Sequence, residues 1–147
     1  MSNKVVEVTA SIESTPDRFY TFFRYQSNNL TNVFPQNFLS VQNVEGEDGE
    51  VGCVKLWNYV LGGIPREIKL KVEAINDAER SITYHALDGD VINFYPVFKF
   101  TIAFGNGVAR WTFVYRKVTP AVPTPVNYGT VFSIDATEVV DLYLLNH

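Results

Sequence analysis

The stretch GCVKLWNY, residues 52–59, has the composition of a β-strand that carries a lysine among large aromatic residues. Successive side chains of a strand point to opposite faces, so Lys55 shares a face with Cys53, Trp57 and Tyr59. The opposite face also carries apolar residues, and alternation alone therefore does not identify the buried face. If the aromatic face is buried, Lys55 is buried with it, and its ammonium group needs either a carboxylate partner or a water-filled cavity.

More strands are expected on both sides of this stretch. From about Phe38 to Val118 the chain reads as six consecutive strands separated by turns. Gly62-Gly63 and Gly105-Asn106-Gly107 are the strongest hairpin signals. Apolar and charged side chains alternate in residues 64–72, which leaves one face in water and favours an antiparallel sheet. The longest strand is expected at residues 94–104.

The segment before residue 38 predicts one strand and two short helices. Apolar and polar residues alternate over residues 6–12, as in a half-buried strand. Ser14-Thr15-Pro16-Asp17 combines a hydroxyl cap with a proline in the first turn, which indicates a helix over residues 16–25. A second short helix, or an irregular segment, is expected to extend to about Val33.

Residues 126–146 have the pattern of one long helix that follows the proline-rich segment 119–125. At about 100° per residue, its apolar face is expected to contain Tyr128, Val131, Phe132, Val139, Leu142 and Tyr143. The opposite face is expected to contain Thr130, Ser133, Thr137 and Asp141. Asp135 interrupts the apolar face between its two halves.

This order of elements predicts an α+β fold in a single domain over residues 1–147. The economical packing wraps a curved antiparallel sheet of seven strands around the long C-terminal helix, with the two short helices between the first and second strands. Aromatic residues are abundant, at 11 Phe, 8 Tyr and 2 Trp. Either a large core or an aromatic-walled pocket would account for them.

Composition and charge exclude several classes of function. The net charge is −4 and no basic run is present, so nucleic-acid binding is not expected. No apolar run is long enough for a membrane span or a signal peptide, and Cys53 is the only cysteine, so a soluble cytoplasmic protein is expected.

Only two histidines are present, and the acidic segment 45–52 reads as a solvated hairpin rather than a phosphate-binding loop. No metal and no cofactor are therefore expected.

Several motifs in register resemble those of a known family. The strand at 52–59 resembles a Gly-x-[Ile/Val]-Lys-x-Trp-x-Tyr pattern that is typical of plant major latex proteins, in the birch-pollen-allergen or pathogenesis-related class-ten superfamily. The other similar stretches are LDGDV at 87–91, RWTFVY at 110–115, VPTP at 122–125 with Tyr128, and YLLNH at 143–147. The resemblance spans nearly the whole chain and implies a START-like helix-grip fold with an internal hydrophobic cavity.

The resemblance also implies two kinds of function. The first is binding of a hydrophobic plant metabolite, such as a terpenoid, steroid, alkaloid or hormone-like compound, in defence or specialised metabolism. The alternative is a cofactor-free enzyme that cyclises or isomerises a terpenoid (iridoid-like) or alkaloid intermediate in the same cavity. One fold supports both roles, so the resemblance does not choose between them. The oligomeric state is left open between a monomer and a weak dimer.

Strand alternation together with the resemblance places a set of side chains toward the interior. The strand positions are Val8, Ala10, Lys55, Trp57, Tyr59, Arg66, Ile68, Leu70, Ile82, Tyr84, Phe98, Phe100, Trp111 and Phe113. The helix positions are Phe22, Phe23, Tyr128, Val131, Phe132, Asp135, Val139 and Leu142. A mostly apolar wall with a few polar groups is typical of a small-molecule pocket. His85 is expected to face away from it, because it alternates with Tyr84, and His147 is terminal.

Three residues in this set are candidates for acid–base chemistry: Lys55, Tyr84 and Asp135. Lys55 could pair with an acid such as Asp135, lie in a wet cavity, or face the surface if the strand is flipped. Tyr59, Tyr84 and Tyr128 could donate hydrogen bonds to a ligand while their rings stack on its carbon skeleton.

Overall fold

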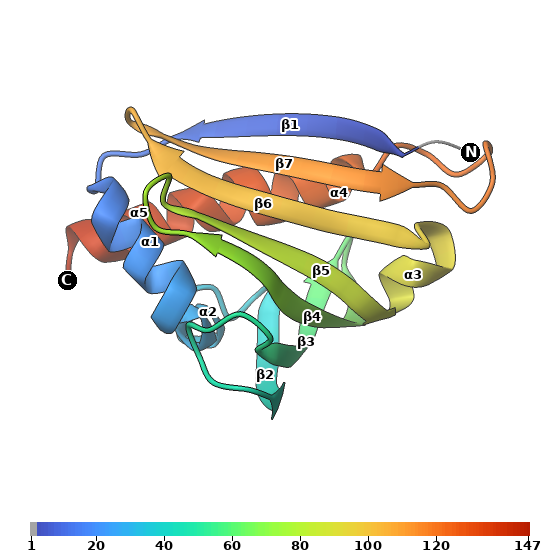
Figure 1. Ribbon diagram of the computed structural model, residues 1–147, viewed down its shortest axis with the longest axis horizontal. Coiled ribbons are helices and arrows are strands. Elements are labelled where there is room, and N and C mark those ends of the chain that lie inside the picture. Colours follow the sequence, from blue (N-terminus) through green and yellow to red (C-terminus); the bar gives the residue numbers. More distant parts are fainter. Residues whose placement is uncertain (1–2) are drawn as a thin grey trace.

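The computed structural model describes residues 3–147, except for the side chains of Asn127 and Val131, and is built on a curved seven-stranded antiparallel sheet (Figure 1). The strands are β1 (Lys4–Ser11), β2 (Phe38–Glu45), β3 (Val54–Leu61), β4 (Ile64–Asn76), β5 (Ser81–Gly89), β6 (Val97–Gly105) and β7 (Val108–Arg116). Their order across the sheet is β1-β7-β6-β5-β4-β3-β2. The predicted fold class is confirmed.

The helical segments are α1 (Pro16–Tyr25), η1 (Ser27–Asn29), α2 (Leu30–Val33), α3 (Asp90–Phe94), α4 (Val126–Tyr128), η2 (Gly129–Asp135) and α5 (Ala136–Leu145). The C-terminal helical segments cover one face of this sheet, α1 and α2 close one end of the fold, and α3 lies at the opposite end (Figure 1). The segment from α4 to α5 crosses the sheet, and η2 packs against β1 and β7. Both α1 and α2 contact α5. No helix in the described part of the chain has the length and apolar character needed to cross a bilayer.

The predicted start of the first helix is confirmed. The Thr15 hydroxyl accepts a hydrogen bond of 3.3 Å from the backbone N–H of Arg18, and Pro16 occupies the first helical position. The cap satisfies one of the amide groups that a helix start leaves unpaired, and proline there loses nothing because its position needs no donor. The helix buries Phe19, Phe22 and Phe23.

The inner face of β3 is the one that carries Lys55, Trp57 and Tyr59. The β3–β4 hairpin turns at Gly62 and Gly63, which have φ angles of +60° and +76°. This turn sets a register in which Trp57 pairs with Ile68. The apolar positions of β4 therefore extend the aromatic face of β3 across the sheet.

The expected strand at 94–104 begins later than the pattern predicts. Residues 90–94 form the short helix α3, and β6 starts at Val97, so the longest strand is β4. Gly89, just before α3, has a φ of +115°, and a Cβ there would lie 2.3 Å from the Glu67 carbonyl oxygen, so the turn into α3 requires glycine. Pro96 has no N–H to donate to a ladder, which explains why pairing starts only after it.

The expected faces of the C-terminal helix are partly wrong: Tyr128, Phe132 and Tyr143 pack inward as expected, but other positions do not. Ser133 and Thr137, expected in water, are 0% exposed, whereas Leu142, expected inside, is 64% exposed. The cause is η2, a π-helical segment whose wider i→i+5 turns break the constant 100° advance assumed from the sequence. The buried positions after it are Ala136, Thr137, Val140 and Leu144.

Candidate functional site

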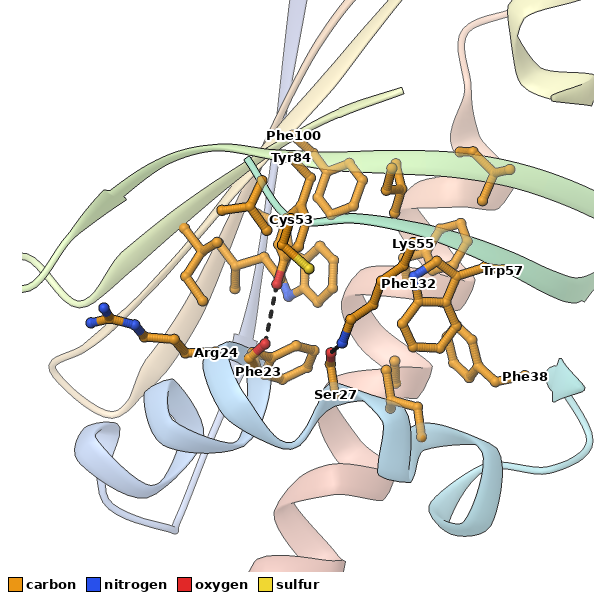
Figure 2. Close-up of a pocket in the computed structure, with 18 of the residues that line it drawn as sticks. Phe23, Arg24, Ser27, Phe38, Cys53, Lys55, Trp57, Tyr84, Phe100 and Phe132 are labelled. Carbon is orange, nitrogen blue, oxygen red and sulfur yellow. Dashed lines mark hydrogen bonds between the residues drawn. The ribbon is translucent and has the colours of Figure 1, made fainter. Parts of the chain in front are cut away.

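An internal cavity lies between the sheet, the α1–α2 segment and the start of α5 (Figure 2). The volume of the cavity, with the part that opens to solvent included, is about 830 Å³. The lining residues are Phe23, Arg24, Ser27, Leu30, Phe38, Gly49, Cys53, Lys55, Trp57, Tyr59, Ile68, Leu70, Val72, Ile75, Ile82, Tyr84, Phe100, Ile102, Trp111, Phe132 and Ala136. An apolar wall with a few polar side chains suits a small organic molecule.

Partial exposure of inward-facing side chains shows that the interior is hollow. Leu70 and Val72 on β4, Tyr84 on β5 and Phe132 on η2 all line the cavity and are only partly buried. In a filled core such side chains would lose all contact with solvent. The aromatic content of the chain thus builds a core and also one wall of a cavity.

Stacked rings form the back of this wall. The Phe100 ring stacks on Trp111 at a centroid distance of 5.8 Å and on Tyr84 at 5.0 Å. Phe132 lies parallel to Phe100 from the helical side, at 6.4 Å. The indole N–H of Trp111 donates a buried hydrogen bond of 3.0 Å to the Thr137 hydroxyl. The wall therefore presents flat apolar surface without an unsatisfied donor at its tryptophan.

Lys55 is the buried cation of the site, with 8% of the residue exposed. Its Nζ donates hydrogen bonds to Ser27 Oγ at 3.1 Å and Asn28 Oδ1 at 2.6 Å, and it forms an ion pair with Asp48 Oδ1 at 2.6 Å. Figure 2 shows the side chain pointing from the sheet toward Ser27. Pairing with an acid was one of the expected outcomes, but the partner is Asp48, not Asp135.

The acidic segment expected to be a solvated hairpin supplies that partner. The carbonyl oxygen of Gly49 accepts a hydrogen bond of 2.9 Å from Arg24 Nε, which ties the segment to α1. Gly49 has a φ of +84°, and a Cβ there would lie 2.2 Å from the Tyr25 ring. Glycine thus permits the close approach that carries Asp48 to Lys55.

The tyrosines of the site have hydrogen-bond partners inside the protein. The Tyr84 hydroxyl donates to the Phe23 carbonyl oxygen at 3.3 Å (Figure 2), and the Tyr59 and Tyr128 hydroxyls lie 2.8 Å apart. Burial away from bulk water raises the pKa of all three phenols above its ordinary value. At neutral pH they are hydrogen-bond donors or acceptors and not bases.

Half of the side chains expected to face the interior lie on the cavity wall. They are Phe23, Lys55, Trp57, Tyr59, Ile68, Leu70, Ile82, Tyr84, Phe100, Trp111 and Phe132. Others lie outside the lining and belong to the surrounding structure: Val8, Ala10, Phe22, Arg66, Phe98, Phe113 and Tyr128.

The remaining candidates came from the assumed helix face. Val139 and Leu142 line a groove on the outside of α5, and Asp135 is not among the cavity residues. The side chain of Val131 lies outside the described part of the structure. The π-helical turn explains why Val139 and Leu142 do not face the cavity, because it rotates the positions that a regular helix would turn inward.

Several cavity residues were absent from the expected set. Cys53, Val72 and Ile102 follow the same strand alternation as predicted neighbours, so the pattern could have included them. Arg24, Ser27 and Gly49 belong to a helix end, a short 3₁₀ turn and a loop. No periodic signal marks such positions. Within the described residues, no three His, Cys, Asp or Glu side chains cluster closely enough to hold a metal ion.

Comparison with known proteins points to one family. The model of the pathogenesis-related protein Bet v 1 family matches residues 1–147. Major latex protein 146 of Papaver somniferum is 32% identical over 81% of this chain and 77% of its own length. MLP-like protein 34 of Arabidopsis thaliana is 27% identical over 98% of the chain. The chain spans about half of that relative, 47% of its length.

Solved structures show the same fold at lower identity. Ginseng major latex-like protein 151 from Panax ginseng superposes with a TM-score of 0.91 at 23% identity, over 97% of this chain and 98% of its own. Norcoclaurine synthase from Thalictrum flavum, in complex with dopamine and hydroxybenzaldehyde, superposes with a TM-score of 0.73 at 17% identity. That match covers 99% of this chain and 88% of the enzyme.

Proposed function

This chain belongs to the pathogenesis-related protein Bet v 1 family and, within it, to the major latex proteins. From that premise we propose that it binds a hydrophobic plant metabolite in its internal cavity. The proposed ligands are terpenoids, steroids, alkaloids or hormone-like compounds that serve defence or specialised metabolism. A cytoplasmic location is part of the proposal, because the single cysteine, Cys53, is a free thiol.

The observation that carries this proposal is the partly exposed aromatic wall of the cavity. Tyr84 and Phe132 line the cavity and are only partly buried, and burial of their remaining exposed surface by a ligand would be favourable. The wall has few polar groups, which favours a ligand with a mainly apolar skeleton.

A cofactor-free cyclase or isomerase is the second candidate. It is favoured by Tyr84, whose hydroxyl lies in the cavity wall as a possible proton donor, and by the norcoclaurine synthase that shares this fold. Two features favour binding over catalysis. The raised pKa of Tyr84 makes its hydroxyl a weak proton donor and keeps it from ionising to a base at neutral pH, and the Lys55 ammonium is engaged by three oxygens.

Incubation with a plant metabolite extract tests both candidates. Bound and newly formed compounds are identified by mass spectrometry for the wild type and for Leu70→Trp, which places a larger ring in the cavity wall. Leu142→Trp is the matched control, because the same substitution lies on the outer surface. Each variant is first shown by circular dichroism to be folded.

The binding proposal expects unchanged compounds to be retained by the wild type and by Leu142→Trp, with retention reduced by Leu70→Trp. A new product that requires the folded protein, and that is lost in Tyr84→Phe, would support the enzyme instead. If folded Leu70→Trp retains the same compounds as the wild type, the ligand is not in the cavity and the proposal fails.

A further inference from the structure

The environment of the Lys55 ammonium group restricts what a ligand could do there. An ammonium group has three N–H donors, and the oxygens of Ser27, Asn28 and Asp48 already surround it. Two of these oxygens are neutral, and the third belongs to a carboxylate. The charge of the lysine is therefore compensated by the protein itself, and the position that an anionic ligand group would take is occupied.

Contacts with both neighbouring segments hold Asp48 at this position. Asn43 lies opposite Lys55 in the β2–β3 register, and its Nδ2 donates to Asp48 Oδ1 at 3.4 Å. On the other side, the hydrogen bond from Arg24 to Gly49 ties the next residue to α1. The Asp48 side chain is 37% exposed, so it lies between the buried ammonium and solvent.

The only other charged residue that lines the cavity in the described structure is Arg24. Its guanidinium forms an ion pair with Asp77 and also donates to Gly49, so it too has a carboxylate partner. Arg66 lies outside the lining. The positive charges of Lys55 and Arg24 are therefore both compensated by carboxylates of the protein.

We propose that Asp48 is a specificity-determining residue that makes the cavity reject carboxylates in favour of uncharged ligands of the same skeleton. This inference rests on the binding function proposed above. A carboxylate ligand near Lys55 would meet the like charge of Asp48, and displacing Asp48 would also break its contact with Asn43. An uncharged ring compound with a hydroxyl or carbonyl group avoids both penalties and still gains the contacts of the aromatic wall.

Two probes with the same ring skeleton test the selectivity: 2-naphthalenemethanol, which is neutral, and 2-naphthoate, which carries a carboxylate. Their affinities are measured by calorimetry for the wild type, Asp48→Asn and Glu50→Gln. Glu50→Gln is the matched control, because it removes one negative charge from the same loop at an exposed residue that is in no ion pair among the described residues.

The wild type is expected to bind the alcohol more tightly than the carboxylate. Asp48→Asn should raise the affinity for 2-naphthoate by about tenfold and change that for the alcohol by less than about twofold, because only the anion interacts with the freed ammonium charge. Glu50→Gln should leave the ratio of the two affinities unchanged. Adding Lys55→Met to Asp48→Asn should abolish the gain in 2-naphthoate affinity.

Two results would overturn the inference. If the alcohol binds but Asp48→Asn does not change the ratio, or if Glu50→Gln changes it equally, Asp48 does not set the selectivity, and the binding function stands. If neither probe binds any variant that thermal unfolding shows to be folded, the proposed cavity-binding function fails, and the selectivity inference fails with it.

Discussion

Trp111 Nε1 and Thr137 Oγ1 form a buried hydrogen bond of 3.0 Å that joins strand β7 to helix α5 beside the cavity. Removal of the hydroxyl would leave the indole N–H without a partner in a region that excludes water. Thr137→Val should therefore lower the free energy of unfolding by about 1–3 kcal/mol.

Urea unfolding measures this change. Thr130→Val serves as the control because Thr130 is exposed, and it should have a much smaller effect. Equal losses in the two variants would mean that the Trp111–Thr137 bond adds nothing beyond the effect of losing a helical threonine hydroxyl.

Removing either partner of the Lys55–Asp48 ion pair should have unequal effects on stability. Asp48→Asn leaves a buried ammonium without a counter-charge and should cost about 1–3 kcal/mol, whereas Lys55→Met leaves a carboxylate that can reach water and should cost less than about 1 kcal/mol. Chemical denaturation of both variants checks the asymmetry. A larger loss for Lys55→Met would contradict the described burial of the two groups.

The loop that carries Asp48 depends on a glycine that packs against a ring. Gly49→Ala would combine a strained φ of +84° with a methyl group 2.2 Å from the Tyr25 ring, and something must shift to admit it. A loss of about 2–3 kcal/mol in unfolding free energy is expected.

Gly52→Ala is the matched control for Gly49→Ala. Its φ is +95°, but a Cβ there meets nothing within 4 Å, so only backbone strain of about 1 kcal/mol is expected. The difference between the two variants, measured by denaturant unfolding, isolates the contact with Tyr25. Equal losses would show that the loop does not pack against that ring.

Stability should fall at alkaline pH because of the buried phenols. Burial raises the pKa of Tyr84 above its ordinary value of 10.0, so above that pH the unfolded chain binds fewer protons at this residue than the folded one. The free energy of unfolding should therefore decrease as pH rises above about 10, up to the raised pKa of the folded state.

Tyr84→Phe should weaken this alkaline loss, since it removes one of the groups that cause it. Thermal unfolding at several alkaline pH values, with phenolate absorbance as a second readout, makes the comparison. A pH dependence as steep in Tyr84→Phe as in the wild type would show that Tyr84 does not contribute.

Strand alternation was a good guide to one wall of the cavity. Trp57, Ile68 and Phe100 line it as expected, because the period of two along a strand is a local property and the hairpin register follows from short turns. Alternation left the inner face of β3 open; the family-like motif at 52–59 favoured the face that carries Lys55, Trp57 and Tyr59, and the structure confirms it. These steps need no knowledge of distant contacts.

The helical wall could not be predicted in the same way. A constant advance per residue placed Leu142 inside and Thr137 in water, and the π-helical segment η2 reverses both. The segment η2 packs against β1 and β7, which lie far from it in the sequence. A helical residue pattern carries no signal for a change from α-helical to π-helical bonding.

The sequence was sufficient for the order of the seven strands, the antiparallel sheet and the inward face of most strands, whereas the short helix α3 and the burial of Lys55 needed the structure. Tertiary structure alone decided that Asp48, from a loop without periodicity, and not Asp135 neutralises Lys55. The physical reason is that strand faces follow from local geometry, whereas an ion pair depends on where a loop folds in space. Here a left-handed glycine, Gly49, and its contact with Tyr25 set that path.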